Sequence, residues 1–365
     1  MYKGHQVSIF NTKIVSNFTE NIKNSSDDPN ASQRKEDHIA LAFRARVEKN
    51  KVDHRFYYEP LLSGHPLSDE ILHQNFLGYV FRMPVWISSM TGGTQKARLI
   101  NHNLARACNE FGLGMGLGSC RQLLYDDTHL KDFQVRQLIG SRPLFANLGI
   151  AQVIQLLHDG KAGLIAEMIR KLEADGLIVH INPMQEYLQP EGDRYRESPL
   201  ETIKRLFDHV EPSSVIVKEV GQGMGKQSLA SLLQLPLAAI DFAANGGTNF
   251  ALLELMRTEK GEGHPLLPLA SIGHSAEEMT DMVNEILSEA PEKIQCCQVI
   301  ISGGIDNFLD GYYLMKKLQI PSLYGQASGF LKHALGSYED LQKYILAQKD
   351  GLMLAHQFLH VKKGT

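Results

Sequence analysis

GLIVHINPMQEYLQPEGDR, residues 176–194, is the stretch around which the rest of the chain is organised. Residues 177–181 read as a short buried strand, because an apolar run is bounded there by a glycine and a proline. Polar side chains gather where that strand ends: His180, Asn182, Gln185, Glu186, Glu191 and Asp193. A rigid strand that ends in such a loop is a common mount for a functional site. An ordinary turn uses the same residue types, so this stretch alone leaves both interpretations open.

The length and the composition limit the class of protein. With 365 residues, of which 43% are hydrophobic and 21% charged, the chain can build one large barrel or two ordinary domains. The formal net charge of −4 gives no general reason to bind nucleic acid or an anionic membrane. No apolar run reaches the roughly 18–20 residues that span a bilayer, and the N-terminus lacks a signal-peptide core. The cysteines lack CxxC spacing, so we expect reduced thiols in a cytoplasmic protein.

A basic cluster lies near the beginning of the chain. Residues 1–33 are polar and weakly patterned. Residues 33–48 read as a helix with one apolar face (Ile39, Leu41, Ala42 and Ala45) and with Arg34, Lys35 and His38 at its start. Cations are unfavourable at a helix N-terminus, where the dipole prefers anions. The cluster is therefore either a solvated group of charges or a clamp for a phosphate.

From residue 84 onward, short apolar runs end in Gly, Ser, Thr or Asn, and most are followed by a helical pattern. The runs occupy residues 85–93, 112–121, 144–149, 177–182, 215–223, 238–249, 299–304 and 322–329. Eight such units predict an α/β protein with a (β/α)8 TIM barrel. A doubly wound open sheet also alternates in this way, but it usually has fewer strands. We assign a possible ninth unit, residues 269–287, to the sixth loop and its helix.

The last two runs end in glycine-rich loops, at residues 302–304 and 325–329, where barrels of this kind bind phosphate. Lys218, at the end of the fifth run, is either paired in the barrel mouth or serves a ligand, because an unpaired buried ammonium is costly. Glu219 alternates to the other side of the strand. The residues alone therefore predict a barrel enzyme with a phosphate-bearing cofactor, FMN, and a second anion site.

Several motifs occur together in the order of one known family. They are RKEDHI (34–39), SMTGGT (89–94), GSCR (118–121), ANLG (146–149), HINPMQEYLQPEGDR (180–194), KEVGQGMG (218–225), GGTNF (246–250) and SGGID (302–306). From residue 34 to about 335 the chain resembles type 2 isopentenyl diphosphate isomerase, the FMN-dependent form. Residues 1–33 are predicted from their polar, weakly patterned sequence to be a mobile N-terminal extension, and the resemblance implies one barrel domain over 34–365. Within that domain, residues 34–83 form a substrate-clamp segment and the barrel strands begin near residue 84.

The resemblance also implies the activity and its helpers. The family reversibly converts isopentenyl diphosphate to dimethylallyl diphosphate in isoprenoid biosynthesis, with Mg²⁺ and reduced FMN. NADPH is the usual reductant, although the reaction involves no net redox change. Homo-oligomers are usual, here a tetramer or an octamer. The Met-rich helices around residues 256 and 279–282 belong either to the core or to such an interface.

Individual roles follow by matching positions. For substrate binding the matches are Arg34, Lys35, His38, Ser119, Arg121, Asn182 and Gln185. For the flavin they are Ser89, Met90, Thr91, Ser119, Asn147, Lys218, Thr248, Gly303, Gly304, Ala327 and Ser328. Glu186 matches the Mg²⁺ ligand, since Mg²⁺ binds through few carboxylates plus phosphate oxygens and water.

The chemistry requires one proton to be added to an alkene carbon and another to be removed, so an acid must be held against a poor base. The resemblance implies that the reduced flavin handles protons at N5. Gln185, Glu254 and His180 are the candidate catalytic side chains, although Glu254 is equally readable as a solvated helix residue. Which group moves each proton is left open.

Three positions depart from the family pattern. Cys120 replaces a frequent Gln, Asp306 replaces a frequent cation after SGGI, and residues 271–273 (SIG) replace an Ile-Pro-Thr run. Asp306 removes a candidate phosphate partner. We expect activity to survive, because no departure touches Gln185 or Glu186.

Two other functions compete with the isomerase. A 2-hydroxy-acid oxidase shares the SGG loop and the fifth-strand lysine, but it needs a His/Arg pair where this chain has GGTN and SGGID. A non-catalytic flavin- or prenyl-phosphate-binding protein predicts the loss of Gln185 or Glu186, and both are present.

Overall fold

The computed structural model describes residues 30–89, 91–257 and 264–362. The chain divides into two units, Met1–His54 and Arg55–Thr365. The first unit holds α2 (Ala31–Leu41) and a 3-10 turn, Lys49–Lys51. Ile39 and Leu41, two of the apolar positions predicted for one helical face, are 74% and 48% exposed. Residues 1–29 lie outside the described part, so the mobile extension and the boundary at residue 33 stay predictions.

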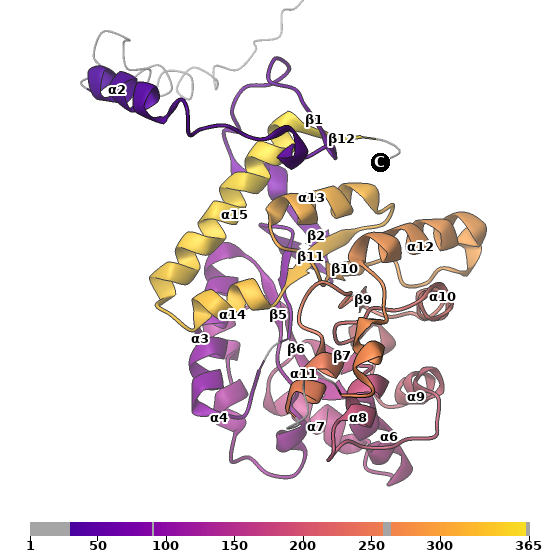
Figure 1. The fold of residues 1–365 in the computed structure, drawn as a ribbon. Helices are drawn as coiled ribbons and strands as arrows, with labels where there is room; N and C mark the ends of the chain where they lie inside the picture. The colour runs from indigo at the N-terminus through magenta and orange to yellow at the C-terminus, as the bar shows by residue number, and fades with distance from the viewer. Residues whose placement is uncertain (1–29, 90, 258–263, 363–365) are drawn as a thin grey trace, which may run out of the picture. The chain divides into compact units, whose positions relative to one another are not determined.

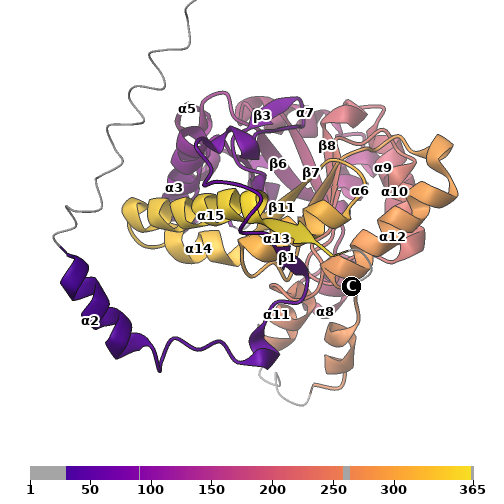
Figure 2. The same ribbon diagram turned by 90° about the horizontal axis from the view of Figure 1, so that it is seen from above.

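The second unit is a closed barrel of eight parallel strands, as predicted, and Figures 1 and 2 show its helices around them. The strands are β4 (Val85–Ile87), β5 (Gly114–Gly116), β6 (Leu144–Gly149), β7 (Gly176–His180), β8 (Val215–Lys218), β9 (Ala239–Asp241), β10 (Val299–Ser302) and β11 (Ser322–Gln326). Seven of them fall within a predicted run, and β7 begins one residue before its run. The runs could be recognised because strands that are buried on both faces must be apolar almost throughout. The pairing of β11, the last of these strands, with β4, the first, closes the barrel and excludes the open sheet.

The helices follow the strands in chain order. They are α3 (Gln95–Phe111), α4 (Leu130–Phe133), α5 (Arg136–Ile139), α6 (Ile150–His158), α7 (Gly163–Lys171), α8 (Pro183–Leu188), α9 (Pro199–Leu206), α10 (Lys226–Leu233), α11 (Phe250–Arg257), α12 (Ala276–Glu289), α13 (Phe308–Lys317), α14 (Ser328–Ala334) and α15 (Tyr338–Phe358). Residues 269–287 form part of a 3-10 turn and most of α12, so the assignment of this stretch to the sixth loop and its helix is confirmed. None of the helices in the described ranges is long and apolar enough to cross a membrane.

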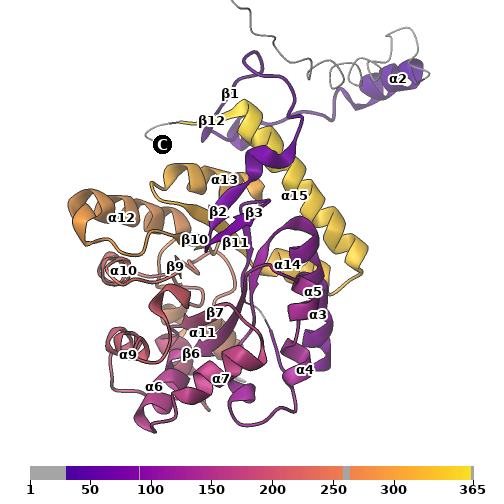
Figure 3. The same ribbon diagram turned by 180° about the vertical axis from the view of Figure 1, so that it is seen from behind.

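An aromatic hairpin closes the N-terminal end of the barrel. Its strands are β2 (Gln74–Phe76) and β3 (Tyr79–Phe81), and Figure 3 shows them beside β10 and β11. Phe76 and Phe81 lie 6.0 Å apart between ring centroids, and Phe81 lies 6.5 Å from Trp86. Trp86 in turn meets Phe145 at 5.9 Å. These rings belong to the buried cluster that fills the barrel interior.

The ends of the second unit meet in a small sheet outside the barrel. There β1 (Phe56–Tyr58) pairs antiparallel with β12 (Leu359–Val361), which directly follows α15. The four cysteines are free. Burial raises the pKa of Cys120 and of Cys296 to about 12, which keeps both thiols protonated and unreactive.

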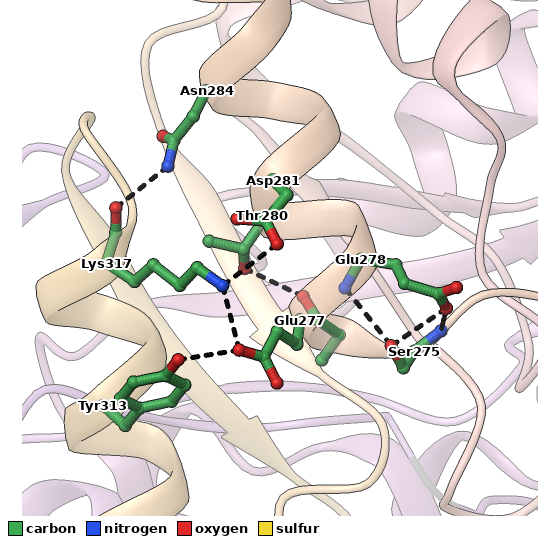
Figure 4. Close-up of polar contacts among 9 residues, drawn as sticks. Ser275, Glu277, Glu278, Thr280, Asp281, Asn284, Tyr313 and Lys317 are labelled. Carbon is green, nitrogen blue, oxygen red and sulfur yellow. Dashed lines mark hydrogen bonds and ion pairs between the residues drawn. The ribbon is translucent and has the colours of Figure 1, made fainter. Parts of the chain in front are cut away.

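Lys317 joins α12 to α13 on the outside of the barrel (Figure 4). Its Nζ lies 2.9 Å from Glu277 Oε1 and 3.0 Å from Asp281 Oδ2. Tyr313 OH donates to the same Glu277 oxygen at 2.7 Å. Burial lowers the pKa of Lys317, but the hydrogen bonds to both carboxylates outweigh this and raise the pKa above its ordinary value.

Lys317→Met is expected to lower the free energy of unfolding by about 1 kcal/mol, because it leaves two carboxylates close together without their shared cation. Urea denaturation at neutral pH measures the loss. Lys226→Met is the matched control, since Lys226 also meets two carboxylates, Glu285 and Glu289, but its side chain is 37% exposed against 20% for Lys317. Equal losses in the two variants would mean that the burial of Lys317 adds nothing.

Candidate active site

A layer of polar side chains lies at the C-terminal ends of the central strands. It consists of Asn147, His180, Lys218, Asp241 and Ser302, from β6, β7, β8, β9 and β10. His180, Lys218 and Asp241 are directly paired across neighbouring strands. Each lies two residues beyond an apolar residue that faces the barrel interior, so alternation turns the polar layer inward as well. The sequence predicted a site role for Asn147, His180 and Lys218, placed Ser302 only at the start of the glycine-rich loop 302–304, and gave no role to Asp241.

The first part of this layer is fixed by hydrogen bonds. Asn147 Nδ2 donates to the Leu117 carbonyl at 3.0 Å, so its Oδ1 faces His180 Nδ1, 2.8 Å away. Burial, together with the nearby Lys218, lowers the pKa of His180 to about 3. The ring is therefore neutral at physiological pH and donates from Nδ1.

Beyond the polar layer lies an open cavity of about 680 Å³. Of the residues predicted to bind the flavin, those that line it are Ser89, Lys218, Thr248, Gly303, Gly304, Ala327 and Ser328. Buried Ser88 Oγ and Ser89 Oγ, on the same wall, have no hydrogen-bond partner within the described ranges. Unpaired buried hydroxyls beside a hollow fit a polar ligand.

Glycines let the loops after β9 and β10 touch. Gly303 has φ +90°, and a Cβ there would lie 2.1 Å from the Ala244 carbonyl oxygen. Gly246 has φ +105°, and a Cβ there would lie 2.7 Å from the Gly304 Cα. Only glycine accepts both the backbone conformation and the contact. The wall of the cavity is therefore made largely of main chain, as a phosphate cradle requires.

Three further residues predicted to bind the flavin, Thr91, Ser119 and Asn147, do not line this cavity but lie near one another. A Cβ on Gly118 would lie 2.4 Å from the Thr91 carbonyl carbon, so the loop that carries Ser119 packs against Thr91. The next residue, Cys120, donates its main-chain N–H to the Asn147 carbonyl at 2.8 Å. Met90 lies outside the described residues.

Asn182 joins the predicted substrate and metal residues on α8. Its Nδ2 donates to Gln185 Oε1 and to Glu186 Oε1, both at 3.1 Å. Glu186 Oε2 accepts the main-chain N–H of Asp193 at 2.7 Å. Asn182 and Glu186 are only 2% and 6% exposed, and Asn182 Oδ1 has no partner among the residues described. The turn interpretation of residues 176–194 does not explain this buried cluster of side chains.

Glu254 faces the same cluster from α11. Gln185 Nε2 donates to Glu254 Oε1 at 3.3 Å. Arg257 Nη1 donates to Glu254 Oε2 at 2.5 Å, and Arg257 Nη2 donates to Glu191 at 2.8 Å. Glu254 is 3% exposed, so its interpretation as a solvated helix residue is wrong.

Arg121 is held by an acidic residue that the sequence prediction left without a role. Its Nη1 lies 3.3 Å from Asp193 Oδ2, which also accepts from Gln152 Nε2 at 3.1 Å. Asp193 thus touches both the predicted diphosphate contact, Arg121, and, through its main chain, Glu186. Asp193 is the last residue of the PEGD sequence and was predicted only as one of the polar side chains that follow the strand. Nothing in the sequence pointed to Gln152.

The remaining predicted substrate residues belong to the first unit. Arg34, Lys35 and His38 occupy exposed positions of α2, whose first turn contains no acidic residue. Their role toward a substrate stays a prediction. Asp306 lines the cavity, and its main-chain N–H donates to Asp310 Oδ2 at 3.1 Å. That loop therefore presents a carboxylate where the family often has a cation.

The closed (β/α)8 barrel, with glycine-rich loops lining the cavity after β9 and β10 and buried Lys218 beside it, places the protein in the class of TIM barrels. Solved structures with the same fold include a mandelate oxidase mutant with a monooxide FMN adduct. Its TM-score is 0.51 at 13% identity, over 85% of this chain and 88% of that one. A mandelate oxidase mutant with (S)-mandelic acid gives 0.52 at 13% identity, over 85% and 87%. At that identity the likeness establishes the fold alone.

Comparison with relatives in sequence identifies the family within this class of barrel proteins. No family model matches the chain. The isopentenyl-diphosphate delta-isomerase of Rickettsia peacockii (strain Rustic) is 33% identical over 325 residues, which cover 86% of this chain and 90% of that protein. The isopentenyl-diphosphate delta-isomerase of Picrophilus torridus is 34% identical over 322 residues, 85% and 86% of the two chains. The protein belongs to the isopentenyl-diphosphate delta-isomerase family and is an isomerase, and its barrel is the fold implied by the resemblance to the type 2 form.

Proposed function

We propose that this protein interconverts isopentenyl diphosphate and dimethylallyl diphosphate by adding one proton and removing another, with Mg²⁺, reduced FMN and no net redox change. The observation that carries the proposal is the buried cluster in which Asn182 touches both Gln185 and Glu186, while Gln185 touches Glu254. Amide and carboxylate groups gathered at the open end of the barrel suit an uncharged alkene attached to a metal-bound diphosphate.

The cavity residues fit FMN. Gly303, Gly304 and the Ala327–Ser328 pair would hold its phosphate, and Lys218 and the unpaired Ser89 hydroxyl would face its ring system. When bound and reduced, for which NADPH would be the reductant, FMN would supply a proton-transfer group against the substrate. The protein's own part is to bind, to orient and to exclude water.

Glu186 would hold Mg²⁺. The described residues contain no group of three or more His, Cys, Asp or Glu side chains that could enclose a metal ion. Mg²⁺ commonly binds through one or two carboxylates together with phosphate oxygens and water, so a single buried Glu186 beside a diphosphate suits it. Asn182 and the Asp193 N–H hold the Glu186 carboxylate at 3.1 and 2.7 Å, which fixes its orientation.

The diphosphate would be held by Ser119, by Arg121 and by the basic residues of α2: Arg34, Lys35 and His38. Arg121 already contacts Asp193, so a diphosphate would share or displace that partner. Gln185 would orient the alkene and Glu254 would hold or move a proton near it, while neutral His180 would shape the pocket. We also expect a homo-oligomer and a cytoplasmic location.

The rival 2-hydroxy-acid oxidase needs a His/Arg pair for its carboxylate substrate. The segments directly after β9 and β10, GGTN and SGGID, contain neither residue. Arg257 lies further along, on α11, but Glu254 and Glu191 already engage it. This arrangement favours the isomerase.

An anaerobic assay tests the proposal. Purified protein receives isopentenyl diphosphate, FMN, Mg²⁺ and NADPH, NMR follows dimethylallyl diphosphate, and each component is then omitted in turn. Product that requires reduced FMN and Mg²⁺, without stoichiometric consumption of NADPH, is the expected result. FMN binding without any product, together with oxidation of a 2-hydroxy acid, would favour the oxidase.

A further inference from the structure

Asp241 is a buried carboxylate that the roles above leave unused. It closes β9 and is 0% exposed. Ser302 Oγ donates to its Oδ1, and that hydroxyl also accepts the Ala243 N–H at 2.9 Å. Its Oδ2 has no hydrogen-bond partner within the described part of the chain. Burial raises the pKa of Asp241 and the nearby Lys218 counteracts this rise, so the carboxylate needs a compensating charge beside it.

Lys218 is the neighbour that can supply this charge. The two residues are directly paired across β8 and β9, so both side chains turn to the same side of the sheet. Lys218 is 8% exposed, and its Nζ donates to the Glu219 carbonyl at 2.6 Å. Lys218 also lines the cavity, whereas Asp241 does not.

The other titratable groups around Lys218 do not replace Asp241. His180, its neighbour on β7, is neutral, and its Nδ1 already donates to Asn147 Oδ1. The Glu219 carboxylate accepts the main-chain N–H groups of Gln222 and Gly223 at 2.5 and 3.0 Å. Among these groups, and within the described residues, Asp241 is the one with a fully buried carboxylate oxygen that has no hydrogen-bond partner.

We propose that Asp241 is a positioning residue for FMN: it is the counter-ion that keeps the Lys218 ammonium charged and in place at the cavity wall. The proposal rests on the FMN site of the proposed function. Burial lowers the pKa of Lys218, while Asp241 and then Glu219 raise it. Lys218 is charged below its pKa, so its contribution to FMN binding is present at low pH and is lost as the pH rises through that pKa. Without Asp241 this loss moves to lower pH.

The experiment measures FMN affinity of the apoprotein by flavin fluorescence from pH 6.5 to 9. Four proteins are compared: the unchanged protein, Asp241→Asn, Lys218→Met and the double variant. At pH 8, Asp241→Asn is expected to weaken FMN binding about 10-fold, because the uncompensated Lys218 then loses its charge at lower pH, and the loss of affinity is expected to be smaller at pH 6.5. In the Lys218→Met background the same change is expected to alter the affinity less than about 2-fold.

Asp208→Asn is the control for the loss of one negative charge, because Asp208 is exposed on the outside of the barrel. An equal loss of affinity in both backgrounds would make Asp241 merely structural, and an unchanged affinity and pH profile in Asp241→Asn would overturn the proposal outright. If Asp241→Asn does not fold, Ser302→Ala removes the donor to Asp241 and is expected to weaken binding about 3-fold at pH 8, again only where Lys218 is present. Protein that binds FMN but makes no dimethylallyl diphosphate would refute the proposed function and leave this inference standing.

Discussion

Glu186→Gln is expected to slow the formation of dimethylallyl diphosphate at least about 100-fold while FMN stays bound, because changes to the partners of metal ligands already cost about 10–100-fold. Gln keeps the shape of the side chain but replaces one carboxylate oxygen by an N–H donor. Both oxygens of Glu186 accept hydrogen bonds, from Asn182 and from the Asp193 N–H. The new amide would therefore point a donor at a donor, in addition to losing the charge that attracts Mg²⁺.

The rate is measured over a titration with Mg²⁺, and FMN content is read from the absorbance of the same sample. Glu197→Gln is the control, since Glu197 pairs with Arg205 at 2.8 Å away from the cluster. Loss of FMN together with activity would show that Glu186 supports the fold and not the metal. An unchanged dependence on Mg²⁺ would remove Glu186 as its ligand.

Glu254→Gln is expected to lower kcat about 10²–10³-fold, within the range that a positioned acid or base contributes. The change keeps an oxygen that can accept from Gln185, but it removes the group that can give or take a proton. It also leaves Arg257 with Glu191 as its remaining carboxylate partner. The KM for isopentenyl diphosphate is expected to change less than about 3-fold, because binding depends chiefly on the diphosphate.

Steady-state kinetics of the FMN- and Mg²⁺-loaded protein separate the two quantities, and Arg257→Met serves for comparison. That variant removes the ion pair but keeps the Glu254 carboxylate, so it is expected to retain most of kcat. If Arg257→Met and Glu254→Gln lose kcat equally, Glu254 acts only as a link between α8 and α11. An unaffected kcat in Glu254→Gln would exclude it from proton transfer.

The barrel could be predicted because its strands are buried on both faces and read as apolar runs with polar ends. The hairpin β2–β3 could not be predicted. Its turn has Leu77 at φ +52°, whereas two-residue turns of this kind are usually recognised by Asn, Asp or Gly at that position. The predicted apolar face of α2 is also exposed within the described part of the chain. Helical periodicity indicates which side of a helix is apolar but not what covers it.

Part of the candidate site could likewise be predicted from the sequence, and part could not. Residues at strand ends, such as Lys218 and Asn147, could be predicted because parallel strands deliver their ends to one face. The pairing of Lys218 with Asp241 could not, because it depends on the register between β8 and β9, and a one-residue shift would turn one of the two side chains away. The contact between Gln185 and Glu254 likewise depends on how α8 packs against α11, 69 positions along the chain.

The aromatic side chains that fill the N-terminal end of the barrel determine how ligands can reach the candidate site. Because Phe76, Phe81, Trp86 and Phe145 fill the N-terminal end, cofactor, substrate and product would all pass through the opposite mouth. In a chamber with a single opening, the two proposed ligands would share one route, so FMN that is already bound would be retained whenever the isoprenoid occupies that route. Loss of FMN would then be fastest in the protein without substrate.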